Sequence, residues 1–111
     1  MKRTTIGELE ELVLLSVGSL YGQAYAVTIL EVIKEHTQRV LDITAIHSVL
    51  RRLEDKGFIT STMGGATKER GGRRKKFFTL SQAGRRVLDE TMEVRIALYN
   101  KLPKLIFTGL S

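Results

Sequence analysis

The chain has 111 residues, an ordinary globular share of apolar residues, and 18 Lys and Arg against 12 Asp and Glu, which gives a net charge of +6. This length allows one domain with a modest core. Because the chain has no cysteine, a disulfide framework, a thiol nucleophile and a cysteine-ligated zinc site are excluded, and we predict a cytoplasmic protein.

The positive charge is concentrated in one part of the chain. Residues 51–86 hold eleven Lys and Arg against three acidic residues, a net charge of +8, whereas the other residues hold seven against nine, a net charge of −2. A basic excess on one supersecondary unit is typical of a surface that binds a polyanion. A solvated basic face is the alternative interpretation.

The N-terminal third predicts two amphipathic helices, over residues 7–20 and 24–37. The expected buried positions of the first are Leu9, Leu12, Val13, Ser16, Val17 and Leu20, and those of the second are Ala26, Val27, Leu30 and Ile33. Tyr21-Gly22-Gln23 indicates a turn, so we do not expect the uncharged run 12–30 to cross a membrane. Glu8, Glu10 and Glu11 interrupt the apolar core that a signal peptide needs, and they favour the positive end of the helix dipole.

A third helix should follow Asp42, whose carboxylate can cap the free N–H groups at the helix start. Its buried stripe is expected to be Ile46, Val49, Leu50 and Leu53, and Gly57 should end it. The opposite face then presents Thr44, Ala45, His47, Ser48, Arg51 and Arg52.

Two strands are predicted next, over residues 58–63 and 75–80, joined by a basic, glycine-rich turn over residues 64–72. Ser81 should cap a last helix of about 30 Å, which runs to about Leu102 and ends before Pro103. Helix, hairpin and helix in this order predict a mainly α fold with a small β-hairpin wing, a winged helix-turn-helix.

The last helix is more apolar than one domain face requires. One stripe is Leu88, Met92, Ile96 and Tyr99, and a second is Val87, Thr91, Val94 and Leu98. We therefore predict a DNA-binding domain over residues 1–80 and a C-terminal dimerisation helix with a short tail over residues 81–111, in one compact unit. The predicted dimer contacts are Leu88, Met92, Ile96 and Tyr99.

A winged helix-turn-helix places one helix in the major groove of double-stranded DNA and the wing against nearby phosphates. Guanidinium groups bind guanine or phosphate bidentately, and the glycines 71 and 72 allow close approach to a sugar–phosphate backbone. The predicted DNA-binding residues are Thr44, Ala45, His47, Ser48, Arg51, Arg52, Lys68, Arg70, Arg73, Arg74 and Lys75.

Other chemistries have little support in the sequence. The two histidines, His36 and His47, have no carboxylate partners at ligand spacing, so we expect no metal site and no cofactor. The glycine-rich segment does not lead from a strand into a helix, so it is not a nucleotide cradle. No Ser, His and Asp residues stand in a recognisable catalytic motif, so we do not expect an enzyme.

Four segments resemble the PadR-type transcriptional regulators over about residues 6–102. They are Leu12-Val13-Leu14-Leu15, the turn Tyr21-Gly22-Gln23-Ala24-Tyr25, the helix exit LRRLEDKGFI over residues 50–59, and GGRRK followed by LSQAG over residues 71–84. The resemblance implies a homodimer joined through the C-terminal helix, which represses transcription and is released by a small molecule. A single C-terminal helix is similar to the short subfamily. The chain departs from the family at His47, where Tyr is usual, and at Lys76-Phe77-Phe78, where a tyrosine pair is frequent.

The sequence therefore predicts a dimeric, sequence-specific DNA-binding regulator, with a small hydrophobic effector as a further partner and no membrane association. One alternative is a winged helix used as a protein-interaction module, whose basic wing meets an acidic protein. A second is a ligand sensor with weak DNA binding, although no Trp is present to stack on an aromatic effector.

Overall fold

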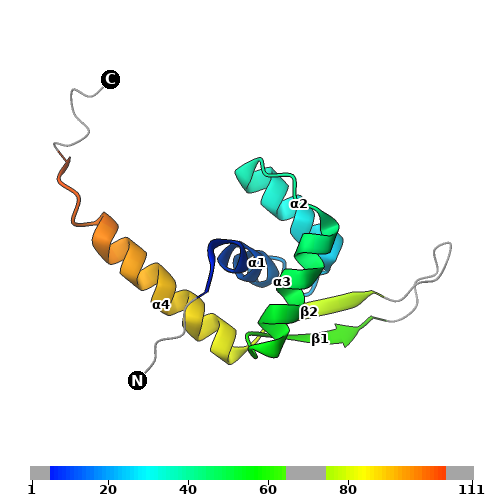
Figure 1. Cartoon of the computed structure of the whole chain (residues 1–111). Helices are drawn as coiled ribbons and strands as arrows, with labels where there is room; N and C mark the ends of the chain where they lie inside the picture. Colours follow the sequence, from blue (N-terminus) through cyan, green and yellow to red (C-terminus); the bar gives the residue numbers. More distant parts are fainter. Residues whose placement is uncertain (1–5, 65–74, 105–111) are drawn as a thin grey trace.

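The computed structural model describes residues 6–64 and 75–104, which form four helices and one hairpin (Figure 1). The helices are α1 (Glu8–Ser19), α2 (Ala26–Thr37), α3 (Ile43–Asp55) and α4 (Gln82–Tyr99), and the strands are β1 (Ile59–Met63) and β2 (Lys76–Leu80). α1 lies at the centre of the molecule, and the hairpin and α4 extend from the body in opposite directions. This is the predicted mainly helical fold with a wing.

The core is one cluster formed where α1, α2, α3 and the hairpin meet. Its centre consists of side chains that are 0–2% exposed, such as Leu14, Ile29, Ile46, Leu50 and Leu53. Burial of each such side chain contributes about 1.5–3 kcal/mol. The predicted stripes of α1 and α3 are confirmed, since every member is buried or partly buried.

The predicted start and buried face of α2 are partly wrong. The helix begins at Ala26 rather than Ala24, because the Ala24 carbonyl accepts a 2.8 Å hydrogen bond from the Phe78 N–H of β2. Tyr25 is therefore extended, and its N–H donates to Thr28 Oγ1. Ile29 and Ile33 are the buried residues of α2, whereas Val27 is 48% exposed.

The turn between α1 and α2 is confirmed, with Gly22 at φ +84°. Gly tolerates this left-handed backbone, which other residues rarely adopt. Within residues 6–64 and 75–104, no helix is both long enough and apolar enough to cross a membrane.

The hairpin is antiparallel and joins α3 to α4. Ile59 pairs with Leu80 and Met63 with Lys76, so each strand is one residue shorter than predicted. The predicted cap and end of α3 and the predicted cap of α4 are confirmed. The Asp42 carboxylate accepts from the Thr44 N–H, Gly57 has φ +81°, and the Ser81 hydroxyl accepts from the Gly84 N–H.

α4 packs on the body mainly through its first turns. Gly84, Val87 and Leu88 are buried, Thr91 and Met92 are half-buried, and residues 93–99 are exposed. The helix ends at Tyr99, three residues before the predicted end. The Lys101 and Leu102 N–H groups bond three residues back instead of four, because the residue before Pro103 is disfavoured in helical geometry.

Candidate nucleic-acid interface

The face of α3 opposite the core is polar and exposed. Thr44, His47, Ser48 and Arg51 are exposed, as predicted, and Ala45 is half-buried. The turn 38–42 connects α2 to α3, with Gln38 in the left-handed region at φ +63°. α2 and α3 therefore form a helix-turn-helix, and in this motif the second helix presents its outer face to base edges.

The two successive arginines of α3 have different surroundings. Among the described residues, Arg51 has no hydrogen-bond or ion-pair partner. Arg52 Nε lies 3.7 Å from Glu10 Oε2, and Lys56 Nζ lies 2.8 Å from the same oxygen. The structure therefore leaves Arg51 free for a ligand and directs Arg52 toward α1.

Glu10 is 7% exposed and is the most buried carboxylate of the described chain. Burial opposes its ionisation, but hydrogen bonds from Lys56 and the Gly7 N–H, with the charges of Lys56 and Arg52, outweigh burial and lower the pKa of the Glu10 carboxyl. Sequence reasoning assigned Glu10 only to the helix dipole. The distance of 46 residues to Lys56 explains why no local pattern showed this contact.

The far end of the described hairpin, where Met63 pairs with Lys76, is joined to the start of α2 by a cation and two rings. Lys75 Nζ lies 4.3 Å from the Tyr25 ring centroid and 3.3 Å from the Tyr25 hydroxyl. The Phe77 ring meets the Tyr25 ring edge-on at 5.4 Å. Lys75 thus has an intramolecular partner that the sequence did not predict, and Tyr25 joins the candidate site.

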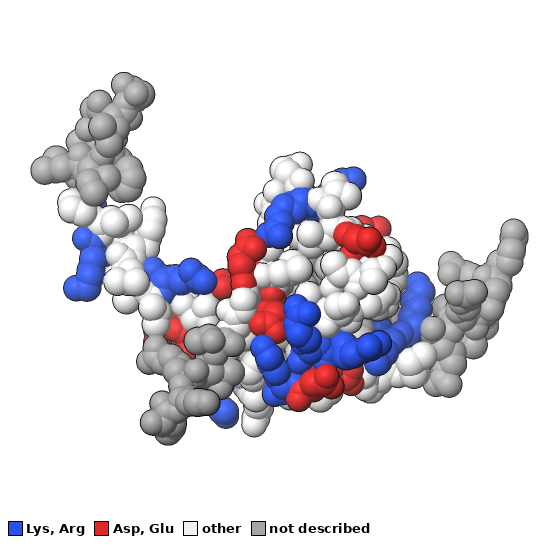
Figure 2. Space-filling view, viewed as in Figure 1, with Lys and Arg blue, Asp and Glu red and all other residues white. Residues whose placement is uncertain are grey.

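Lys76 points to the other side of β2, because side chains alternate along a strand. Its Nζ lies 3.6 Å from Glu54 Oε1, and the second Glu54 oxygen accepts from Ser61 Oγ at 2.6 Å. Figure 2 shows Lys and Arg gathered over the C-terminal half of α3 and the base of the hairpin, with acidic side chains beside them. Lys68, Arg70, Arg73 and Arg74 lie outside the described residues.

The predicted dimer contacts fall into two groups. Leu88 is 6% exposed and belongs to the core of its own chain, and Met92 is half-buried. Ile96 and Tyr99 are 57% and 70% exposed, as is Leu98 of the second stripe at 61%. The free apolar surface of α4 therefore begins after Leu88.

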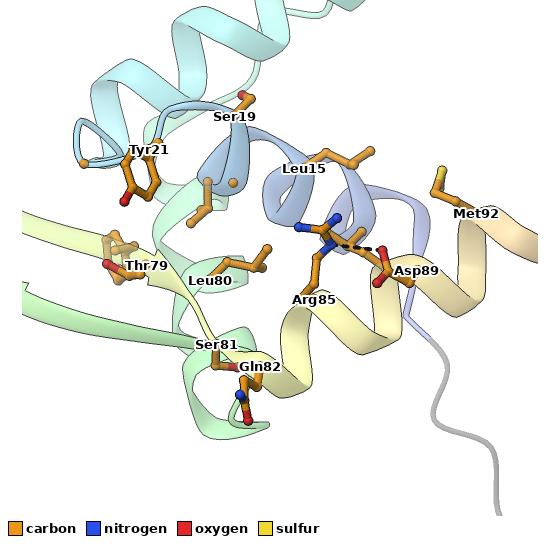
Figure 3. A pocket seen from close by; sticks show the side chains of 15 residues that line it. Leu15, Ser19, Tyr21, Thr79, Leu80, Ser81, Gln82, Arg85, Asp89 and Met92 are labelled. Atoms are coloured by element: carbon orange, nitrogen blue, oxygen red, sulfur yellow. Dashed lines mark hydrogen bonds and ion pairs between the residues drawn. The ribbon is translucent and has the colours of Figure 1, made fainter.

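A groove of about 980 Å³ lies between α1, β2 and the first turns of α4 (Figure 3). Leu15, Leu80 and Met92 supply apolar lining, and Tyr21 lies at the end opposite Met92. Arg85 and Asp89 pair across one helical turn at 3.0 Å on its wall. Sequence reasoning did not predict this groove, because its lining comes from two stretches, 15–22 and 78–92, that are far apart in the sequence.

Helix-turn-helix, hairpin wing and a long last helix define the class of winged helix-turn-helix proteins. The profile of the transcriptional regulator PadR-like family matches residues 12–90. The chain belongs to this family. A comparison with curated proteins gave no match.

Solved structures show the same fold. A PadR family transcriptional regulator from Eggerthella lenta is 25% identical, with a TM-score of 0.65 over 92% of this chain and 88% of that chain. A PadR-like transcriptional regulator from Bacillus cereus is 16% identical, with a TM-score of 0.69 over 91% and 93%. Bacillus subtilis PadR, solved in complex with operator DNA, is 23% identical, with a TM-score of 0.61 over 79% of this chain and 48% of that chain.

Proposed function

We propose that this protein is a dimeric transcriptional regulator that binds operator DNA through α3 and the wing. The observation that carries the proposal is the polar, exposed face of α3, on which Arg51 has no partner among the described residues. Lys and Arg gather over the C-terminal half of α3 and the hairpin (Figure 2). Operator DNA in the Bacillus subtilis PadR structure supports it by likeness of fold. In a dimer, two copies of α3 would enter successive major grooves about 34 Å apart.

Within this proposal, recognition and affinity have different sources. Base edges would be read by the exposed face of α3, that is, by Thr44, Ala45, His47, Ser48 and Arg51. Sequence-independent affinity would come from phosphate contacts of the wing. The residues assigned to them are Lys68, Arg70, Arg73, Arg74 and Lys75. Tyr25 would hold Lys75 at the point where the first helix of the motif crosses the DNA backbone.

The second half of α4 supports the homodimer. Ile96, Leu98 and Tyr99 place three large apolar side chains in solvent, and Leu15 of α1 adds a fourth, 40% exposed. An exposed apolar surface on a helix that extends from the body is typical of a subunit interface. A second copy of α4 would cover it across a two-fold axis.

Repression and release by a small molecule follow from the family resemblance. The observation that favours an effector is the groove between α1, β2 and α4, whose size suits a drug-sized apolar ligand. A molecule bound there would contact both α4 and β2, and thus the elements proposed for the dimer and the wing.

Fluorescence anisotropy tests DNA binding. The protein is titrated onto the duplex upstream of its own gene and onto a scrambled duplex, at low and at physiological salt. We expect tighter binding to the upstream duplex at both salt concentrations. Arg51→Ala should weaken that binding by about 1–3 kcal/mol, because a bidentate base contact is lost.

Lys101→Ala is the matched control, since it removes one exposed positive charge just beyond the end of α4. The C-terminal end of α4 extends away from α3 (Figure 1). It should leave the preference for the upstream duplex unchanged. Equal binding of both duplexes that disappears at physiological salt would contradict the proposal. That result would favour the alternative, a basic wing that binds an acidic protein.

A further inference from the structure

Three glutamates in the first turn of α1 pair with three different parts of the molecule. Glu8 Oε2 lies 2.8 Å from Arg39 in the turn before α3, and Glu11 Oε1 lies 2.9 Å from Arg95 of α4. Glu10 contacts Lys56 and Arg52 at the C-terminal end of α3. Of the three, Glu10 is therefore the one joined to the face proposed to meet DNA.

We propose that Glu10 is a positioning residue for sequence discrimination. Its carboxylate holds Lys56 and directs Arg52 toward α1, which reduces the attraction of this end of α3 for phosphates of any sequence. The free Arg51 then contributes a larger share of the binding. This inference rests on the proposed DNA-binding function.

The geometry makes Glu10 a fixed anion rather than a mobile one. Its Oε1 accepts a 2.8 Å hydrogen bond from the Gly7 N–H, and its side chain is 9% exposed. Arg52 and Lys56 are four residues apart, so they lie on one face of the helix and reach the same carboxylate oxygen. Arg51 lies about 100° around the helix from Arg52 and escapes this contact.

The pairing of Arg52 and Lys56 with Glu10 should weaken sequence-independent binding to DNA. Each cation that neutralises a phosphate releases counterions and steepens the dependence of log K on log salt by about 0.9, whatever the sequence. A cation held by an internal carboxylate contributes less to that effect. Glu10→Gln frees two cations beside α3 and adds one unit of net charge, so non-specific binding should rise more than specific binding.

The test compares three variants that remove the same charge from the same helical turn. With Glu10→Gln, we expect the scrambled duplex to bind about three- to tenfold more tightly, and the salt slope to steepen by about 1–2. The upstream duplex should gain less, so the ratio of the two affinities falls. Glu8→Gln and Glu11→Gln should leave that ratio unchanged, because their carboxylates do not contact α3.

Equal behaviour of all three variants would overturn the inference, whereas failure of the unmodified protein to prefer the upstream duplex would overturn the proposed function. A second pair of variants, Arg51→Gln and Arg52→Gln, keeps the test valid if Glu10→Gln does not fold. Arg51→Gln should reduce the ratio of the two affinities more than Arg52→Gln does, because only Arg52 is paired with Glu10. An equal loss from the two would also overturn the role assigned to Glu10.

Discussion

α3 and α4 are both long amphipathic helices, but the rest of the chain buries different fractions of their apolar faces. α3 buries Ile46, Val49, Leu50 and Leu53, a stripe that follows the helix to its last turns. α4 buries residues only up to Leu88, and its residues 93–99 are all exposed. The apolar face of α3 is thus complete within one chain, which frees its polar face for a ligand. The apolar face of α4 stays exposed in the single chain at Ile96, Leu98 and Tyr99.

The largest effects are expected from one substitution on each helix. One shortens a buried side chain of α3, and the other places a charge on the exposed apolar face of α4. Leu53→Ala should lower the free energy of unfolding by about 2–5 kcal/mol, because Leu53 is fully buried. Ile96→Glu should leave the helical circular dichroism spectrum intact and convert the proposed dimer to a monomer in light scattering. A protein that stays dimeric with Ile96→Glu would contradict the role of the distal half of α4.

A smaller effect is expected at the contact between α4 and the hairpin. A Cβ at Gly84 would lie 2.1 Å from the Phe58 carbonyl oxygen, a backbone atom that cannot move away. Gly84→Ala should therefore lower the free energy of unfolding by about 1–3 kcal/mol or more.

Gly18→Ala in α1 is the matched control for Gly84→Ala, since its Cβ would approach only a Leu80 side chain at 3.4 Å. It should be neutral or stabilising, because Ala favours a helix over Gly by about 1 kcal/mol. Thermal unfolding of both variants measures the difference. Equal stability would show that the first turn of α4 is not anchored on the hairpin.

The smallest effect concerns the link between α1 and the end of α3, and it depends on pH. The folded protein lowers the pKa of Glu10 below its ordinary value of 4.5, so the ionised carboxylate stabilises the fold above that pH. The contribution is lost as the pH falls through the lowered pKa. Urea unfolding should therefore show Glu10→Gln less stable than the unmodified protein at neutral pH, with the difference shrinking in acid. A constant difference would contradict the ion pairing.

Sequence periodicity predicted α3 well for a physical reason. Its buried and exposed positions alternate with the helical repeat, and its ends carry local signals, the Asp42 cap and Gly57. The order of helices and strands was predicted from periodicity, turns and caps along the chain, and it agrees with the PadR-like fold. The hairpin strands were predicted within one residue, because their apolar alternation and glycines are also local.

Predictions were poorer where distant segments decide the outcome. The start of α2 depends on a hydrogen bond between Ala24 and Phe78, and the burial of Leu88 depends on where α4 meets the body. The partners of Glu10 and Lys75 are 46 and 50 residues away in sequence. Helical spacing cannot show such contacts, because it reports one element at a time.

The wing closes at its base, where β1 and β2 meet the flanking helices. Ser81 Oγ donates to the Gly57 carbonyl at 2.6 Å, and the Ser81 N–H donates to the Phe58 carbonyl at 3.0 Å. The two ends of the segment 58–80 are thus fastened to each other whatever lies between β1 and β2. Doubling a flexible connection costs only about 0.6 kcal/mol. A change in the length or charge of the connection between β1 and β2 should therefore leave the junction of α3, the hairpin and α4 in place.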